Sequence, residues 1–326
     1  MDELLQGLRA VAERTRLRIL GLCAHGELTA TDLAEILGQS QPRVSRHLKL
    51  LVEAGLLERN QEGSWAYYRF ASGSTNAGQL GRMLVDLMPE DDPVLGLDLE
   101  RLEAVKQAWA VKAAAFFQRH AVDWDSIQAL HVDQARVDAA VKRLFRRAPA
   151  SDLLDIGTGT GHVLQLLGEE VDAAIGIDRS RDMLIVARAN IHRAGLRHCQ
   201  VRHADMMHLP FSAGSTDAVT FHMVLHYAED PAGAIAEAAR VLRPGGRVII
   251  VDFAPHRREE LREQHAHRWL GFSDSRIETF LTEAGLVPGE PEHLQGGPLT
   301  VVLWHGTRPA NAEIASESAR VAGGGS

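Results

Sequence analysis

The 326-residue sequence contains only two cysteines, Cys23 and Cys199. They lie far apart in the chain, so no disulfide framework is expected and a reducing cytoplasm fits. No apolar run approaches the length of a membrane span. The chain opens with Asp2 and Glu3 and lacks the basic and apolar regions of a signal peptide. We therefore expect a cytoplasmic protein that does not engage a membrane.

An excess of basic residues is also missing, because the formal net charge is −8. This charge argues against non-specific nucleic-acid binding by the whole molecule, although it does not exclude a local basic helix. The composition is that of an ordinary globular protein, and the length suits two domains. The only glycine-rich run lies at 323–325. We expect residues 310–326 to form a disordered tail.

Three segments differ in their patterns. Residues 1–75 predict short helices with apolar stripes, followed by a β-hairpin over 56–70. Residues 76–147 predict a helical connection, with helices at 99–120 and 132–145 and a hinge between Pro89 and Pro93. Residues 148–309 alternate short apolar strands with helices, which predicts a doubly wound α/β fold. We expect the strands at 153–156, 173–178, 200–203, 218–221, 247–253 and 299–305.

Two short helices joined by a tight turn at Gly38 and followed by a hairpin predict a winged helix-turn-helix. Its second helix, which we expect to start at Ser40, would enter the major groove of DNA. No carboxylate interrupts this helix between Glu35 and Glu53, and its Arg, Lys, Gln and Ser side chains are types that contact bases and phosphates. The alternative is a basic face that is merely solvated. The residues that we expect to contact DNA are Gln41, Arg43, Ser45, Arg46, His47 and Lys49 on the helix, and Arg59 and Arg69 on the hairpin.

Residues 17–70 resemble the ArsR/SmtB family of bacterial repressors, on the segments SQPRVSRHLKLLVEAGLL and YYRF. The resemblance implies binding to double-stranded operator DNA by a homodimer formed through residues 2–11 and 76–88. Many metal-sensing members carry two cysteines in the helix before the recognition helix. Here Thr29 and Thr31 stand in that region, and hydroxyls are poor ligands for soft metals. We therefore expect no metal site in this module and another ligand as its regulator.

A glycine-rich turn, DIGTGTG at 155–161, follows a predicted strand and precedes a predicted helix. Glycines let the backbone turn sharply and approach a ligand, but such a turn alone also suits dinucleotides. The next strand ends at Asp178, which can accept hydrogen bonds from ribose hydroxyls. The third strand ends near Asp205, which can accept from an adenine amino group, and Met206, which can pack on the ring. The segments LPF at 209–211 and VLRPGG at 241–246 complete the pattern.

Together, these motifs resemble class I S-adenosylmethionine (SAM)-dependent methyltransferases over residues 151–307, especially the ubiquinone-biosynthesis and small-molecule subgroup. The resemblance implies a Rossmann-like, seven-stranded sheet with a final antiparallel strand. It implies SAM or S-adenosylhomocysteine (SAH) as the cofactor and no metal, with His222 beside the sulfonium. The residues that it assigns to the cofactor are Asp155, Gly157, Thr158, Gly159, Gly161, Asp178, Arg179, Met183, Asp205, Met206 and His222.

The sequence leaves the catalytic residues open. SAM carries its own leaving group, so the protein mainly aligns the attack, and a general base helps only a protonated acceptor. Among 16 histidines some lie near any cleft by chance. Metal binding by His265 and His267 is not expected, because they lie two apart on a predicted helix. Arsenite methylation is rejected because it needs several thiols. The candidates for a chemical role are His222, His226, Asp252 and His256.

Two functions remain open. In the first, the protein is a DNA-binding regulator whose methyltransferase domain senses SAM or SAH, with residues 76–147 transmitting the signal. In the second, it is an active methyltransferase for a small molecule, with an accessory DNA-binding domain. A third, DNA base methylation, is weaker because the expected Asn/Asp-Pro-Pro-aromatic signature is absent and the region 222–225 reads HMVL.

Overall fold

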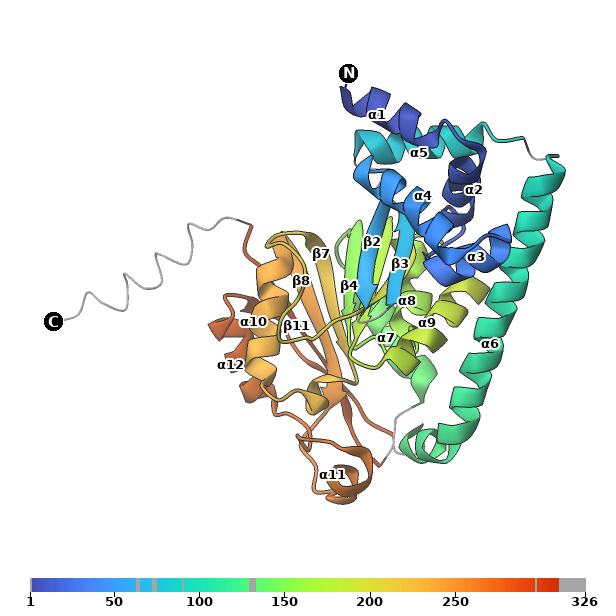
Figure 1. The fold of residues 1–326 in the computed structure, drawn as a ribbon. Helices are drawn as coiled ribbons and strands as arrows, with labels where there is room; N and C mark the ends of the chain where they lie inside the picture. The colour runs from blue at the N-terminus through green and yellow to red at the C-terminus, as the bar shows by residue number, and fades with distance from the viewer. Residues whose placement is uncertain are drawn as a thin grey trace.

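The computed structural model describes residues 2–62, 65–71, 75–89, 91–128, 133–296 and 298–310. Figure 1 shows a helical N-terminal part beside a larger α/β part, with one long helix running along both. The predicted hairpin tip at Gly63 lies outside the described residues, as does the predicted disordered tail at 310–326 apart from Ala310. No described helix combines the length and the apolar composition that crossing a membrane requires.

The N-terminal part begins with four short helices whose ends follow local signals. Thr29 and Asp32 form a capping box at the start of the third helix, and Gly38, with a φ of 63°, ends it in the left-handed region. Pro42 lies in the first turn of the fourth helix, where a missing N–H costs little. The helices are α1 (Asp2–Val11), α2 (Arg14–Cys23), α3 (Ala30–Leu37) and α4 (Gln41–Glu53).

The expected hairpin consists of β2 (Leu57–Glu62) and β3 (Trp65–Phe70). A two-residue strand that the sequence did not predict, β1 (Leu28–Thr29), pairs with β3, so the sheet order is β1-β3-β2. This small sheet packs its apolar side chains on α2, α3 and α4, which closes the N-terminal core.

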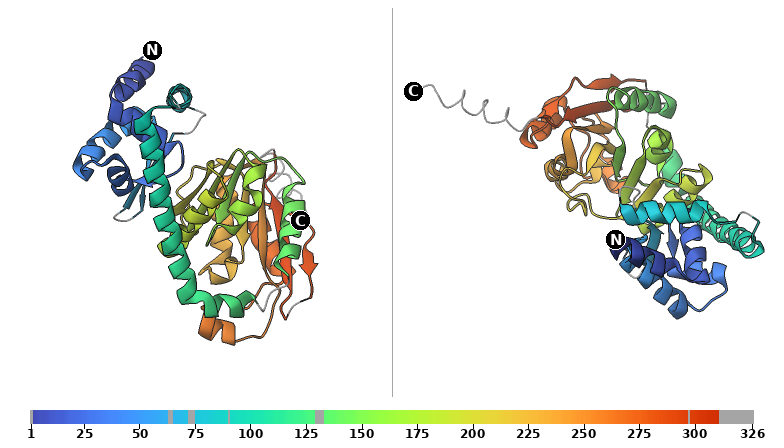
Figure 2. Two further views of the ribbon diagram at one scale, coloured as in Figure 1. Left: turned by 90° about the vertical axis from the view of Figure 1, so that its right-hand side faces the viewer. Right: turned by 90° about the horizontal axis from the view of Figure 1, so that it is seen from above.

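The connecting segment contains α5 (Asn76–Asp86), α6 (Pro93–Gln128) and α7 (Gln134–Phe145). Helix α6 starts at Pro93 and not at the expected position 99. Asp92 Oδ1 accepts hydrogen bonds from the N–H groups of Val94 and Leu95, and this interaction caps the helix. Leu102 of α6 is buried in the N-terminal core, while the same helix contacts α9 of the α/β part. Figure 2 shows α6 alongside both parts.

The large sheet has the order β10-β11-β8-β7-β4-β5-β6, and the short β9 (Val287–Pro288) also pairs with β11. Strand β11 runs antiparallel to β8, while β4–β8 pair in parallel. The predicted seven-stranded sheet with a final antiparallel strand is confirmed, and β9 is an addition. The strands are β4 (Asp152–Ile156), β5 (Ala173–Asp178), β6 (Cys199–His203), β7 (Thr216–His222), β8 (Leu242–Phe253), β10 (Glu292–Leu294) and β11 (Val301–Thr307).

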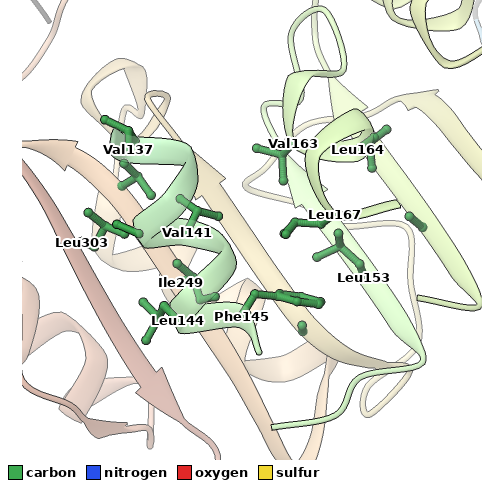
Figure 3. Close-up of a cluster of buried hydrophobic side chains, with 14 of the residues drawn as sticks. Val137, Val141, Leu144, Phe145, Leu153, Val163, Leu164, Leu167, Ile249 and Leu303 are labelled. Carbon is green, nitrogen blue, oxygen red and sulfur yellow. The ribbon is translucent and has the colours of Figure 1, made fainter. Parts of the chain in front are cut away.

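Helices cover both faces of this sheet and bury a core on each. Figure 3 shows Val141 and Leu144 of α7 near Ile249 and Leu303 of the sheet. Because both faces are covered, a ligand meets the sheet at the carboxyl ends of its parallel strands. The remaining helices are α8 (His162–Leu167), η1 (Gly168–Glu170), α9 (Arg181–Arg193), η2 (Leu225–Tyr227), α10 (Pro231–Val241), α11 (Glu260–His265) and α12 (Asp274–Glu283).

Candidate functional site

The predicted recognition helix, α4, turns most of its apolar residues inward and its polar residues outward, although Leu50 is exposed. Val44, Leu48 and Leu51 are buried in the N-terminal core. Their burial fixes the orientation of the helix and leaves a continuous polar face toward solvent. On that face Gln41, Arg43, Arg46 and Lys49 are exposed, while Ser45 and His47 are half-buried.

The two arginines predicted on the hairpin lie in different surroundings. Arg59 is exposed and donates a hydrogen bond to Gln61. Arg69 lies opposite Glu58 in the strand register and forms an ion pair with it, and its side chain is only 14% exposed. A contact between Arg69 and DNA would therefore require the guanidinium to leave Glu58.

The glycine-rich turn between β4 and α8 adopts the backbone that its glycines permit. Gly157, Gly159 and Gly161 have φ angles of 71°, 53° and 81°, values that side chains disfavour. A Cβ atom on Gly157 would lie 2.2 Å from Val224 Cγ2, whereas one on Gly159 would meet no atom within 4 Å. At Gly159 the turn therefore leaves open space in which a ligand could approach the backbone closely.

Two aspartates brace this turn. Asp155 is buried, accepts a hydrogen bond from Thr220 Oγ1 at 2.6 Å, and has a pKa raised by burial to about 6. Asp178, at the end of β5, accepts from the N–H groups of Gly159 at 2.9 Å and Ser180 at 2.7 Å. Each oxygen of Asp178 keeps a further acceptor site, so this carboxylate can also receive ribose hydroxyls.

The predicted adenine end lies beyond β6. Asp205 Oδ1 accepts from the N–H of Met207 at 3.0 Å, and Met206 packs beside the buried core. The Arg179 side chain is 73% exposed, with its Nε 3.8 Å from Asp205 Oδ2. Met183 is half-buried in the first turn of α9. The space at Gly159 and the carboxylates of Asp178 and Asp205 are groups that could receive the amino-acid, ribose and adenine parts of SAM, as the sequence predicts.

At the end of β7, His222 is followed by a strained backbone. Met223 has a φ of 53°, which is rare for a residue with a side chain. The His222 ring lies 5.6 Å from the ring of His162. His162 Nε2 is in turn 2.8 Å from Asp138 Oδ1 of α7. Nothing in the sequence indicates a role for His162 or Asp138, because only the folded chain brings α7 to this edge.

A second histidine cluster lies under the end of β8. His226 Nδ1 is 2.8 Å from Asp252 Oδ1, and both side chains are buried. The His267 ring stacks on His226 at 4.0 Å. Burial, reinforced by His226, lowers the pKa of His267 to about 3. His256 contacts the same cluster through Phe253, at 5.8 Å between ring centroids, and burial lowers its pKa.

The expectation that His265 and His267 share a helix is wrong. Helix α11 ends at His265, and Ala266 adopts a left-handed φ of 55°. The chain then folds back, so that His267 is buried against His226. Two of the four predicted catalytic candidates, His226 and Asp252, are thus in contact with each other.

The two parts of the chain meet at a buried arginine that the sequence analysis did not single out. Arg188 of α9 has its Nε 3.5 Å from Glu27 Oε2, with side-chain exposures of 8% and 7%. Its guanidinium lies 3.7 Å from the ring centroid of Tyr67 on β3 and donates to the Val201 carbonyl of β6 at 3.2 Å. Arg188 therefore connects the hairpin of the N-terminal part to the strand that leads to Asp205.

Comparisons with known proteins agree with this division of the chain. Residues 13–59 match the family model described as a bacterial regulatory protein of the arsR family. Residues 154–250 match the family model described as a methyltransferase domain.

Three relatives share the methyltransferase part. A demethylmenaquinone methyltransferase of Thermus thermophilus is 36% identical over 118 residues, which is 36% of this chain and 53% of that protein. An arsenite methyltransferase of Halobacterium salinarum is 33% identical over 114 residues, or 34% of this chain and 29% of that protein. The structure of YcgJ from Bacillus subtilis aligns with a TM-score of 0.48 and 18% identity, covering 54% of this chain and all of that one.

The chain spans about half the length, or less, of the curated relatives that it matches. The methyltransferase family model covers β4 to β7 and most of β8, whereas the arsR-family model covers α2 to the recognition helix α4 and ends within β2. The chain therefore joins a DNA-binding domain of the arsR family, at residues 13–59, to a methyltransferase domain at residues 154–250.

Proposed function

We propose that this protein is a DNA-binding transcriptional regulator whose methyltransferase domain senses SAM or SAH. The observation that carries the proposal is the position of Arg188 between Glu27, Tyr67 and the Val201 carbonyl. Val201 belongs to β6, whose following residues include Asp205 and Met206 of the candidate adenine site. A ligand that shifts the end of β6 would change the surroundings of the hairpin.

Coupling of this kind requires the ligand to bind the DNA-competent and DNA-incompetent arrangements with different affinity. The buried Arg188–Glu27 pair can supply such a difference, because a buried charge left without its partner is costly. Helix α6 offers a parallel connection, since it contacts α3 as well as α9. We divide the chain accordingly into a DNA-binding part at 1–75, a helical connection at 76–147 and a SAM-binding part at 148–309.

The exposed face of α4 supports the DNA-binding half of the proposal. We assign base and phosphate contacts to this face, with Arg46 at its centre, and an additional phosphate contact to Arg59. The double-stranded operator would meet two copies of the chain, because α1 and α5 pack together and leave apolar side chains in solvent. Those exposed side chains are Leu4, Leu5, Leu8, Met83 and Leu87. A dimer that covers this face would show twice the chain mass in light scattering, and Leu87→Glu would shift it to the monomer.

Ligand binding and DNA binding can be measured separately to test the sensor. SAH binding is followed by calorimetry, and DNA binding by fluorescence anisotropy with a duplex that the wild-type protein selects from random sequence. The proposal expects the DNA affinity to change when SAM or SAH is saturating. If the ligand binds and the DNA affinity stays the same, the sensor function is contradicted, and methyl transfer is then the function that the methyltransferase domain supports.

A second function, methyl transfer to a small molecule, is favoured by the His226–Asp252 pair. The Asp252 carboxylate accepts from His226 Nδ1–H and also from the backbone N–H of His226 at 3.1 Å. This arrangement leaves the lone pair of the ring on Nε2, which is buried without a hydrogen-bond partner among the described residues. His226 could then take a proton from an acceptor if the cover formed by His267 opens.

The bound cofactor would supply an electrophilic methyl group with its own leaving group. The chain would align the acceptor near His222 and move its proton to His226. Arsenite is a poor candidate acceptor, because Cys23 and Cys199 are both buried and burial raises the pKa of each thiol to about 12. The test is a methyl-transfer screen in which SAH formation is measured for wild type, His226→Asn and the surface control His293→Asn. Loss of turnover with unchanged SAH affinity in His226→Asn alone would support the enzyme.

A further inference from the structure

We infer that Asp138, His162 and His222 form a binding site for a divalent transition-metal ion at the carboxyl edge of the large sheet. The three residues come from α7, from the first position of α8 and from the last position of β7. One ligand atom of each lies within 4.8 Å of the others, and all three side chains are partly buried. Within the part of the chain that the structure describes, this is the only such group of three.

The spacing suits one ion. Bonds of about 2.0–2.2 Å from a metal to nitrogen and oxygen place neighbouring donors roughly 3 Å apart. His162 Nε2 and Asp138 Oδ1, at 2.8 Å, already have that spacing. The longest separation in the set is at most 4.8 Å, so binding requires the three side chains to close together by rotation.

The donor set indicates which ions are suitable. Two imidazoles and one carboxylate suit Zn²⁺, Co²⁺, Ni²⁺ and Fe²⁺ better than Ca²⁺ or Mg²⁺, which prefer oxygen ligands. Three protein ligands also leave at least one coordination position open, as at catalytic metal sites. Gln134 Nε2 donates to Asp138 Oδ1 at 2.8 Å and lies 3.3 Å from His162 Nε2, so metal binding requires this amide to turn away from both ligand atoms.

A simple His–Asp hydrogen bond could account for two of the three residues. The chain contains such a pair elsewhere, because His293 Nε2 lies 2.9 Å from Asp274 Oδ2 with about two fifths of each side chain exposed. The Asp138–His162 pair differs in having a third donor, His222, directed into the same space. In addition, His162 directly follows the glycine-rich turn, whereas His293 belongs to the edge strand β10.

The position gives the ion a role that rests on the proposed SAM site. If SAM lies on the turn from Gly157 to Gly161, the ion is next to the sulfonium end of the cofactor. Its open position would then hold an oxygen or sulfur atom of the methyl acceptor. This predicts an acceptor with a metal-binding hydroxyl or thiol group, and not an amine attached to an otherwise apolar molecule.

The test uses the full chain, stripped with a chelator and titrated with Co²⁺ by visible absorption and with Zn²⁺ by calorimetry. We expect one ion per chain with Co²⁺ d–d bands. His162→Gln and Asp138→Asn should each weaken binding at least tenfold, and His293→Gln should not. Both substitutions change a partly exposed side chain, and circular dichroism checks that the variants fold.

Absence of one-to-one binding in the wild type would overturn the inference, as would equal affinities in wild type, His162→Gln and Asp138→Asn. A titration with SAH on the same samples separates this result from the proposed function. Absence of SAH binding by the wild type would contradict the SAM site. Absence of Co²⁺ binding by a wild-type chain that does bind SAH would contradict the metal site alone.

Discussion

Arg188 Nε lies 3.5 Å from Glu27 Oε2 in a place where both side chains are almost fully buried. The two residues belong to different domains, and the Arg188 guanidinium also lies over the ring of Tyr67 in the β2–β3 hairpin. An ion pair in this position holds the hairpin and strand β6 in a fixed relation. Its removal should therefore affect communication between the domains more than either domain by itself.

The first prediction concerns this pair. Replacing Arg188 alone would remove one member of a buried ion pair, at a cost of roughly 3–5 kcal/mol in stability. The double variant Glu27→Gln/Arg188→Gln removes both charges. We expect it to bind SAH and DNA separately, but to lose most of the effect of SAH on DNA affinity. Calorimetry measures the affinity for SAH, and anisotropy measures the affinity for DNA and its change when SAH is added. Arg193→Gln, on the exposed side of the same helix, is the control.

An undiminished effect of SAH in the double variant would exclude Arg188 from the coupling. Helix α6, which contacts both α3 and α9, would then be the remaining connection to examine.

The second prediction concerns the recognition helix. Arg46 is exposed on α4, on the face opposite the buried Leu48. Arg46→Ala should weaken binding to the selected duplex by roughly 1–3 kcal/mol and relax sequence preference if the guanidinium reads a base. The same loss on every sequence, together with a smaller salt dependence, would make Arg46 a phosphate contact. Unchanged affinity would remove it from the interface.

The third prediction concerns the ribose acceptor. Asp178 is held by the N–H groups of Gly159 and Ser180. Asp178→Ala should abolish measurable SAH binding in calorimetry, because both acceptor oxygens are lost. Asp182→Ala changes an exposed carboxylate one turn away and should leave the affinity unchanged. Circular dichroism spectra should overlay for all three proteins, and retained affinity in Asp178→Ala would refute the ribose assignment.

The fourth prediction concerns pH. The pKa of His267 falls from 6.5 to about 3 on folding, so the unfolded chain binds this proton at a higher pH than the folded chain does. The stability that neutral His267 contributes is thus complete above pH 6.5 and is lost as the pH falls toward 3. Between pH 6.5 and 5, protonation of His267 in the unfolded chain should lower the free energy of unfolding of the wild type by about 1–2 kcal/mol.

His267→Phe cannot take up the proton and should show a flatter dependence of the free energy of unfolding on pH, measured by urea denaturation. The exposed His293→Phe is the matched control and should follow the wild type. Equal slopes for wild type and His267→Phe would mean that His267 is not the group responsible.

Local sequence patterns predicted many of the helices, strands and turns, because strand ends, helix caps and glycine turns depend on short stretches of sequence. Strand β5 was predicted with its observed bounds, and the recognition helix and the glycine-rich turn were also located. Strand β8 begins at Leu242 and not at 247. The segment RPGG at 243–246 lacks the apolar pattern of a strand, so the sequence does not indicate the earlier start. Helix α6 begins earlier than predicted because the Asp92 side chain caps its first turn.

The contacts that matter most for function could not be predicted, because they join distant segments. Asp138 reaches His162, and Arg188 reaches Glu27, only when helices pack on the folded sheet. His267 was placed on a helix because nothing in the sequence indicates a left-handed Ala266. The sequence includes His226 and Asp252 among the catalytic candidates, but it does not indicate that the two side chains are in contact.

If ligand occupancy in the methyltransferase domain alters DNA binding, the effect should appear when the selected duplex is titrated with the full chain, alone and with saturating SAM or SAH. We expect at least one of the two ligands to change the DNA affinity fivefold or more, which is about 1 kcal/mol of coupling. Identical affinities in all three titrations, with ligand binding verified by calorimetry, would contradict this expectation.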